Sequence, residues 1–143
     1  MDLKEAKLKY LESESETDYR IFCETLQKSD IWFPMIWELT EEEKKKFENA
    51  EIGGDIHIET PRNPAYFQGP DDTILIYIFS ERAEIPKKLW DEYSFQWCSS
   101  AWARAASKAI KTIRYNEVVI VLDVDTEPLW FGDEVFDEQK QEE

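Results

Sequence analysis

Two stretches of the chain are continuously apolar, and they are the clearest signal in the hydrophobic pattern. Residues 73–79 read TILIYIF and residues 117–124 read EVVIVLDV. A short run of β-branched and other apolar residues without polar alternation is typical of a strand that is buried on both faces of a sheet. We therefore expect two central strands with helices covering both faces.

Apolar residues spaced three and four positions apart mark the helices. They predict helices over residues 2–13, 17–28, 84–93 and 99–114. Thr17 and Asp18 are expected to cap the start of the second helix. The last helix shows the best pattern, and its predicted buried stripe consists of Trp102, Ala105, Ala106, Ala109, Ile110 and Ile113.

Shorter strands are expected at residues 31–37, 55–60 and 94–97. Pro34 interrupts the first of them and has no N–H for a β-ladder, which predicts a position at a sheet edge or a bulge. Thr40 followed by Glu43 predicts the capping box of a short, highly charged helix.

These elements predict a single layered domain of the α/β or α+β class, with a mixed sheet of about four to five strands flanked by helices. We expect residues 1–14 to form a peripheral N-terminal helix and residues 15–132 to form the domain. Residues 133–143 are expected to be an acidic, flexible tail.

The charge of the chain is strongly negative and unevenly distributed. The formal net charge is −15, and residues 123–143 carry nine acidic residues against Lys140. Such a charge disfavours contact with nucleic-acid backbones and anionic lipid and favours basic partners. The alternative is that the charge only keeps the protein soluble. Residues 104–114 carry four positive charges and no acid, which indicates a balanced surface or a seat for the acidic segments.

Residue types that are common in catalytic and metal sites are scarce. The chain has one histidine, His57, two cysteines and four glycines. This composition provides no zinc-ligand spacing, no glycine-rich nucleotide loop and no nucleophile–histidine pair, so we expect no metal and no cofactor. The cysteines are expected to be reduced, and the charged first residues do not form a signal peptide, which together predict a cytoplasmic protein.

Residues 123–126, DVDT, follow an apolar strand and resemble the first motif of haloacid-dehalogenase-type phosphatases. That resemblance implies Asp123 as the attacking carboxylate and Asp125 as the acid and base, with magnesium between them. Only 18 residues follow Asp125, so the later motifs of such enzymes cannot come after it. A permuted arrangement would have to recruit earlier residues, namely Lys87 or Lys88 and the pair Asp71 and Asp72.

Aromatic residues beside acidic ones are the candidate binding residues. Residues 61–72 hold three prolines and predict a long loop, which would display two aromatic side chains. If Tyr66 and Phe67 lie together with Trp130 and Phe131 on the surface, the four side chains would form an apolar hot spot rimmed by acidic residues. The alternative is that these aromatic side chains close the core. The predicted partner-binding residues are Tyr66, Phe67, Asp71, Asp72, Asp123, Asp125, Glu127, Trp130 and Phe131.

Three segments resemble the N-terminal domain of the SseB family of bacterial proteins. Residues 26–34, LQKSDIWFP, look like that family's helix-to-strand opening, and residues 78–82, IFSER, resemble its strand ending before a helix. The helix at residues 99–114 then leads to a final strand and a proline turn. Residues 126–128 read TEP where the family tends to have Asn-Pro-Gly. The resemblance covers residues 18–131 and implies an α/β binding module without established catalytic residues.

Together these features favour a non-enzymatic, acidic binding or regulatory protein, for example an immunity-type inhibitor of a basic toxin or nuclease. Two alternatives stay open: a nucleic-acid mimic with rows of carboxylates, and a magnesium-dependent phosphatase that uses Asp123 and Asp125. We expect a basic protein partner, with no direct nucleic-acid binding and no membrane binding. The sequence does not indicate an oligomeric state.

Overall fold

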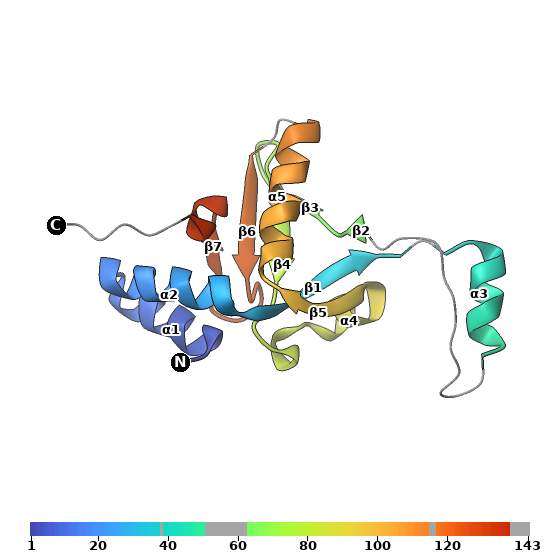
Figure 1. The fold of residues 1–143 in the computed structure, drawn as a ribbon, viewed down its shortest axis with the longest axis horizontal. Helices are drawn as coiled ribbons and strands as arrows, with labels where there is room; N and C mark the ends of the chain where they lie inside the picture. The colour runs from blue at the N-terminus through green and yellow to red at the C-terminus, as the bar shows by residue number, and fades with distance from the viewer. Residues whose placement is uncertain (38, 51–62, 115–116, 138–143) are drawn as a thin grey trace.

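The chain forms a mixed α/β fold in which helices pack against two small sheets (Figure 1). The computed structural model describes residues 1–37, 39–50, 63–114 and 117–137. Its α-helices are α1 (Leu3–Ser13), α2 (Glu16–Lys28), α3 (Glu41–Glu48), α4 (Lys87–Glu92) and α5 (Ala101–Arg114). Two 3₁₀ helices are η1 (Arg82–Glu84) and η2 (Asp133–Phe136). The strands are β1 (Asp30–Ile36), β2 (Asn63–Pro64), β3 (Phe67–Gln68), β4 (Ile74–Ile78), β5 (Ser94–Ser99), β6 (Val118–Leu122) and β7 (Leu129–Phe131).

The larger sheet is mixed and has the strand order β3-β4-β6-β7. Its central strands β4 and β6 run parallel, whereas β3 and β7 pair antiparallel to them at the two edges. The smaller sheet, in the order β2-β1-β5, is antiparallel. The predicted class, a single small α/β domain with a mixed sheet flanked by helices, is confirmed. The three-stranded sheet is an addition that the sequence pattern did not indicate.

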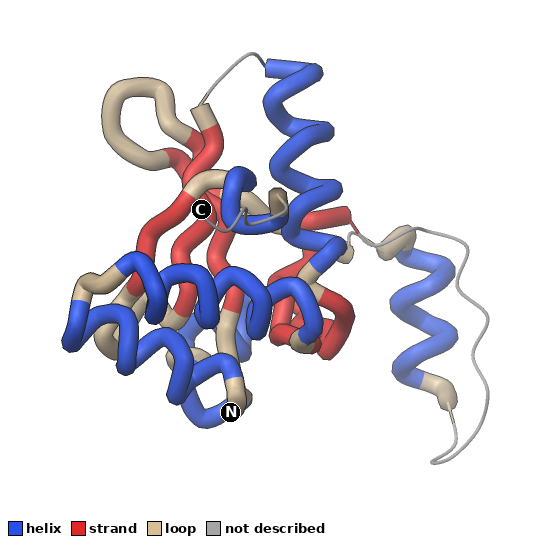
Figure 2. The backbone as a smooth tube through the Cα atoms, turned by 60° about the vertical axis from the view of Figure 1, so that its left-hand side comes forward, coloured by secondary structure: helices blue, strands red, loops and turns tan. Residues whose placement is uncertain are grey.

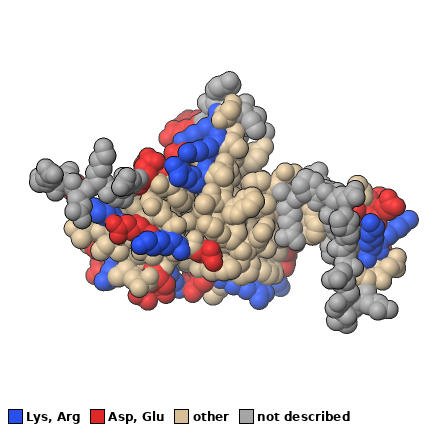
Figure 3. All heavy atoms as spheres, viewed as in Figure 1, with Lys and Arg blue, Asp and Glu red and all other residues tan. Residues whose placement is uncertain are grey.

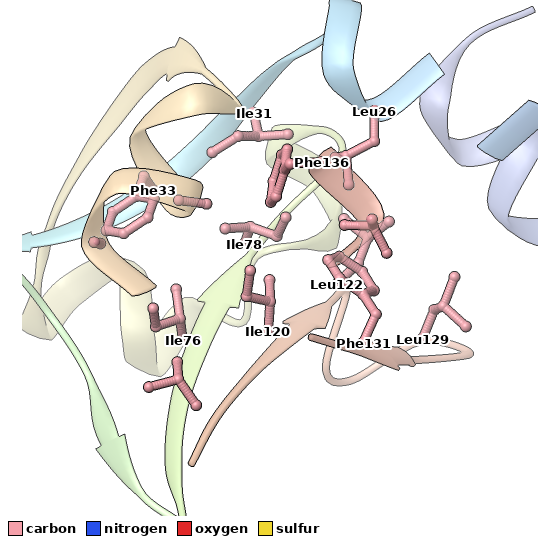
Figure 4. Packing of buried hydrophobic residues seen from close by; sticks show 14 of the residues in the cluster. Leu26, Ile31, Phe33, Ile76, Ile78, Ile120, Leu122, Leu129, Phe131 and Phe136 are labelled. Carbon is pink, nitrogen blue, oxygen red and sulfur yellow. The ribbon is translucent and has the colours of Figure 1, made fainter. Parts of the chain in front are cut away.

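One face of the four-stranded sheet forms the core. Residues that pair across strands share a face, so Ile76, Ile120 and Phe131 lie together on this side. Helices α2 and α5 and the 3₁₀ helix η2 cover this face, and Figure 4 shows the packed side chains. The covering residues include Phe22, Leu26, Ala103, Ile110 and Phe136. Each such aliphatic or aromatic side chain contributes roughly 1.5–3 kcal/mol on burial.

The opposite face of this sheet is less completely covered. Tyr77, Val121 and Trp130 form the corresponding row on that side. Val121 is buried, but Tyr77 and Val119 are half-buried and Trp130 is exposed. The expected helical cover on both faces is therefore incomplete, and the uncovered part is where aromatic residues collect.

Strand β1 is central in its sheet, which corrects the expected edge position of Pro34. Trp32 exchanges two backbone hydrogen bonds with Phe79, and the carbonyl of Pro34 accepts one from Ala65. These bonds lie on the side of β1 away from β5, where pairing is limited to an isolated bridge and the two-residue β2. The ring nitrogen of Pro34 points to this sparsely paired side, since the nitrogen and carbonyl of a strand residue face the same way. The proline is thus accommodated without a long ladder on that side.

The N-terminal helix takes part in the core, contrary to the expected peripheral role of residues 1–14. Helix α1 lies beside α2 across one end of the four-stranded sheet (Figure 2). Leu3 and Ala6 belong to the core cluster, and Lys7 is buried as well. The sparse apolar residues of α1 are enough because most of them share one side: Tyr10 and Leu11 pack against the same core as Leu3 and Ala6.

The first part of the expected acidic tail is also packed. Val135 and Phe136 of η2 are buried in the core, and Gln27 Nε2 donates to the carbonyl of Val135 at 2.8 Å. The run of carboxylates around these two residues hid their apolar character in the sequence. Residues 138–143 lie outside the described part of the chain.

Helix boundaries differ from the expected ones in two places. Ser15, not Thr17, caps α2, since its side chain accepts a hydrogen bond from the amide of Asp18. The segment 84–93 is split into η1 and α4 around Pro86. The capping box of α3 is confirmed by reciprocal bonds between Thr40 and Glu43. The expected strand at residues 55–60, with His57, lies outside the described residues.

Helix α5 is rotated relative to its predicted buried stripe. Of the predicted stripe, Ala106 and Ile110 are buried, Trp102, Ala105 and Ala109 are exposed, and the side chain of Ile113 lies outside the described part. Ala103 and Ser107, which were not in the stripe, are buried instead. Small side chains on the buried side let the helix approach the sheet closely, and the bulky Trp102 is left at the surface. The basic residues of α5 behave as the charge pattern indicated. Lys111 pairs with Asp133 at 3.1 Å and Arg104 lies 3.9 Å from Asp137, so this helix seats the start of the acidic segment.

Candidate functional site

The carboxyl ends of the parallel strands β4 and β6 carry a buried polar cluster. Ile78 and Leu122 end these strands and pair with each other, so the residues that follow lie side by side. The amide of Asp123 donates to the carbonyl of Ile78 at 2.9 Å and continues the pairing by one residue. In α/β sheets, this end of the parallel strands is where ligand-contacting groups most often lie.

Asp123 is the centre of the cluster and is 0% exposed. Its carboxylate accepts hydrogen bonds from the amide and the hydroxyl of Ser80, at 2.8 and 2.7 Å. Lys7 Nζ, on a side chain that is 1% exposed, lies 3.0 Å from Asp123 Oδ2 and donates a second bond to the carbonyl of Thr126. A buried ion pair is tolerated only when its remaining hydrogen-bonding groups are satisfied, and these contacts provide that.

A second ion pair fastens α1 to η1. Lys4 Nζ lies 2.7 Å from Glu84 Oε1 and 2.9 Å from Glu81 Oε1. Hydrogen bonds from Lys4 and from the Thr126 hydroxyl hold the pKa of the Glu84 carboxyl below its ordinary value. In return, the hydrogen bonds to Glu81 and Glu84 raise the pKa of Lys4. Glu84 therefore links Lys4 of the N-terminal helix to Thr126 in the segment after β6.

The turn between β6 and β7 has a strained backbone that this cluster holds in place. Asp123 and Glu127 have positive φ values of 55° and 44°, in the left-handed region that non-glycine residues rarely adopt. Within the turn, the amide of Thr126 donates to the carbonyl of Asp123 at 3.0 Å. A conformation of this kind persists only where its surroundings determine it. The buried bonds of Asp123 and Thr126 are those surroundings.

The geometry at Asp123 does not suit the phosphatase alternative. A serine and a lysine do reach this carboxylate, but they saturate it in a buried position, whereas a nucleophile must reach its substrate. Asp71 and Asp72 precede the start of β4, so they lie at the opposite end of the parallel strands from Asp123. Lys87 and Lys88 are exposed on α4. In the described ranges, no group of three or more His, Cys, Asp or Glu residues could hold a metal ion.

The turn displays two carboxylates and leads into an exposed tryptophan. Asp125 and Glu127 are exposed, whereas Leu129 and Phe131 of β7 are buried on the core side. Between them Trp130 points the other way and is 53% exposed. The alternation of a strand thus fixes Trp130 outward while its two neighbours anchor the backbone.

Trp130 shares its side of the sheet with a group of packed aromatic rings. The Phe67 ring stacks on Tyr77 with centroids 4.5 Å apart, and Tyr93 meets Phe67 edge-on at 5.4 Å. Tyr77 is in the same cross-strand row as Trp130, with Val121 between them. Burial, and then the charge of Asp125, raise the pKa of the Tyr77 hydroxyl. We call Phe67, Tyr77, Tyr93 and Trp130 the aromatic face.

The structure brings together only part of the predicted binding set. Phe67 and Trp130 lie on the same face of one sheet, and Asp125 and Glu127 belong to the turn beside it. The other predicted residues are elsewhere: Tyr66 is exposed just before β3, Asp71 and Asp72 form the turn at the far end of the strands, and Asp123 and Phe131 are buried. The two buried residues support the surface rather than form it.

Several residues of the site were missed in the sequence, although two of them carried a signal. Lys7 falls with Leu3, Ala6 and Tyr10 at helical spacing, which places it in the middle of the apolar stripe of α1. Tyr77 is the one polar-tipped aromatic in the run 73–79. Ser80 and Glu84 gave no such signal, because their role depends on strand pairing.

No protein-family model, curated protein or solved structure matches this chain. The resemblance to the SseB family therefore stays a prediction. Within the described residues, none of the helices combines the length and the apolar character needed to cross a bilayer.

Proposed function

We propose that this protein is a non-enzymatic, acidic binding protein that recognises a basic protein partner through the aromatic face and the adjoining carboxylates of Asp125 and Glu127. The observation that carries the proposal is the exposure of Trp130 on a strand whose neighbouring residues are locked in the core. Tryptophan and tyrosine are the residues most enriched among the energetic centres of protein interfaces.

The chemistry of the surface fits cationic side chains. A tryptophan or tyrosine ring attracts an arginine or lysine cation over its face, and a nearby carboxylate adds a charge-assisted hydrogen bond. Asp125 and Glu127 are exposed on the turn that leads into β7 and Trp130, so both kinds of group are available on neighbouring segments. The net charge of −15 would accelerate the approach of a basic partner over longer distances.

The buried cluster gives this surface its rigidity. Lys7 and Ser80 hold Asp123 and, through Thr126, the turn that carries both exposed carboxylates. A surface that is already ordered loses little conformational entropy on binding. This support explains why a fully buried ion pair lies directly beneath an exposed acidic turn.

Affinity capture with the immobilised full chain tests the proposal. At low salt we expect the chain to retain a basic protein from a lysate of its source cell, and the double variant Asp125→Asn/Glu127→Gln and the variant Trp130→Ala should retain it weakly. The matched control is Glu41→Gln/Glu42→Gln, which removes the same charge from exposed positions on α3. Retention of no basic protein, or equal retention by the site variants and the control, would contradict the proposal.

The other readings of the sequence are less well supported by this geometry. A nucleic-acid mimic needs carboxylates in regular rows, whereas Asp71 and Asp72 are separated from Asp125 by the length of the parallel strands. A toxin inhibitor is one form of the proposed function, since a toxin with a basic active site would be a basic partner. The proposal keeps the cytoplasm as the expected compartment.

A further inference from the structure

The smaller sheet has an edge that is unlike the other sheet edges. Among the described strands, the edge strands β2, β3 and β7 have two, two and three residues, whereas β5 has six. Natural sheets protect their edges with short strands, prolines or charged side chains. Residues 94–99, SFQWCS, contain none of these devices.

The backbone groups of β5 that face away from β1 can be assigned from the hydrogen bonds. Trp32 uses both its amide and its carbonyl toward Phe79, so the Trp32–Trp97 pair is a non-hydrogen-bonded pair of the β1–β5 ladder. The amide and carbonyl of Trp97 therefore point outward, as do those of Phe95 and Ser99 two residues away. In the described part of the chain, no backbone partner meets the outward groups of Phe95 and Trp97.

The side chains of this edge strand are uncharged, and two exposed tryptophans lie on or beside it. Trp97 is 49% exposed and Trp102, at the start of α5, is 56% exposed. A shallow hollow beside the end of β5 is lined by Ser99, Ala101, Trp102 and Ala105. In Figure 3, the surface over β5 and along one side of α5 shows neither acidic nor basic side chains, while charged side chains lie to the left of this area and below it.

The distribution of charge favours a second copy of this chain as the partner of the β5 edge. Residues 93–116 form the longest stretch of the chain without an acidic residue, in a protein with a net charge of −15. Two copies of such a protein repel each other wherever their acidic surfaces meet, so self-association is least opposed here. A basic partner would be attracted to the acidic surfaces instead.

We propose that two copies of this chain associate by antiparallel pairing of β5 with β5 across a twofold axis at Trp97. Trp97 would then face Trp97 of the second copy in a hydrogen-bonded pair, and Phe95 would face its Ser99. This register satisfies the outward groups and joins the two three-stranded sheets into one continuous sheet. Twofold interfaces are self-complementary in this way. Phe67, Tyr77 and Trp130 of the aromatic face belong to the other sheet, whereas Tyr93 directly precedes β5. The pairing uses residues 95–99 and none of the aromatic face, so this inference does not depend on the proposed basic partner.

Sedimentation equilibrium of the full chain tests the pairing. We expect the mass to rise with concentration from that of one chain to that of two. Trp97→Lys places two like charges directly opposite each other and removes the Trp contact, so it should weaken self-association roughly tenfold or more. The control Gln68→Lys puts the same charge on β3, an edge strand of the other sheet, and should leave it unchanged. A wild-type chain that stays monomeric at every concentration overturns the proposal.

Mixing opposite charges tests the register. Because residue 97 faces its own copy, a mixture of Trp97→Lys and Trp97→Glu should associate more strongly than either variant alone. Association of the mixture that is no stronger than that of each variant would exclude the twofold axis at this residue.

Amide hydrogen exchange of the wild-type chain tests the same interface without a substitution, in case the variants fail to fold. The amides of Phe95 and Trp97 should exchange more slowly as concentration rises. Those of Gln96 and Cys98, which face β1, should be protected at all concentrations. Concentration-independent exchange at Phe95 and Trp97 would overturn the pairing whatever the variants do.

Discussion

Trp130 and Trp97 are both half-exposed tryptophans on edge strands, yet their surroundings differ in charge and in backbone availability. Trp130 lies on a three-residue strand that follows a turn with two exposed carboxylates. Trp97 lies on a six-residue strand without charge, and its own backbone groups point to the open side. Side-chain exposure alone would class the two together. Charge favours a basic partner at the first, and the unpaired backbone favours another β-strand at the second.

The sharpest contrast is expected between neighbours on β7. Phe131→Ala removes a ring that packs against Phe22 at 5.6 Å in the core and should destabilise the fold by about 3–5 kcal/mol. Trp130→Ala removes an exposed ring from the same strand and should cost far less stability while it weakens partner binding. Urea unfolding of both variants measures the first effect. Comparable losses of stability would mean that Trp130 is part of the core, and would weaken its assignment to a binding surface.

Removal of the buried Lys7 charge should affect binding at the aromatic face but not pairing through β5. Lys7→Met leaves the buried Asp123 carboxylate without its cation, which costs about 3–5 kcal/mol for a typical buried pair. The turn between β6 and β7, which carries Asp125 and Glu127, should loosen, so partner binding should fall. Pairing through β5 should persist in any protein that remains folded. Urea unfolding and sedimentation of the same samples measure the two effects.

Lys9→Met is the matched control, because Lys9 is exposed on the same helix. It should leave stability nearly unchanged. A similar loss of stability in both variants would indicate that helix α1 responds to any loss of positive charge, and not that Asp123 needs Lys7.

Salt should act on the two surfaces with opposite signs. Raising the ionic strength from about 0.05 to about 0.5 M screens the attraction between carboxylates and a basic partner, so capture should weaken severalfold. The same change screens the repulsion between two chains of charge −15, so pairing through β5 should strengthen. Capture and sedimentation over one salt series measure both trends. The same sign of salt dependence for both processes would contradict this division.

The smallest expected effect is the pH dependence that Glu84 contributes. Because Lys4 and Thr126 lower the pKa of this carboxyl in the folded state, its stabilising contribution is fully present above the ordinary glutamate pKa of about 4.3. It is lost as the pH falls further through the lowered, folded-state pKa. Glu84→Gln should therefore be less stable than wild type at neutral pH, and the difference should shrink below about pH 4.

Urea unfolding at several pH values measures this difference. Glu81→Gln is the matched comparison, because it removes the other, more exposed carboxylate that pairs with Lys4. A difference between wild type and Glu84→Gln that grows toward acid would reverse the assigned direction of the shift.

Much of the fold follows from local pattern. The apolar runs at residues 73–79 and 117–124 became β4 and β6, and the helical spacing placed α2 and α5 within a few residues of their observed bounds. The Thr40–Glu43 capping box was also correct. These features depend on neighbours in sequence, for which side-chain period and backbone hydrogen bonding are sufficient.

The errors arose where distant partners decide the outcome. Pro34 was tolerated in a central strand because the opposite side of β1 is paired only at isolated points. The buried side of α5 was set by how closely small residues can approach the sheet, so Trp102 faces outward against its predicted place in the stripe.

The sequence by itself determined that the chain is an acidic α/β domain with two central strands. It predicted nine partner-binding residues, of which Phe67, Asp125, Glu127 and Trp130 belong to the surface proposed above. Only the tertiary structure decided that Asp123 is buried against Lys7 while Asp125, two residues later, stays exposed beside the aromatic rings. The physical reason is that charge and polarity are properties of a residue, whereas burial and hydrogen bonding depend on which strands and helices meet. The parallel pairing of β4 with β6 brings Ser80 to Asp123 across 43 positions, and the docking of α1 brings Lys7 to the same carboxylate across 116.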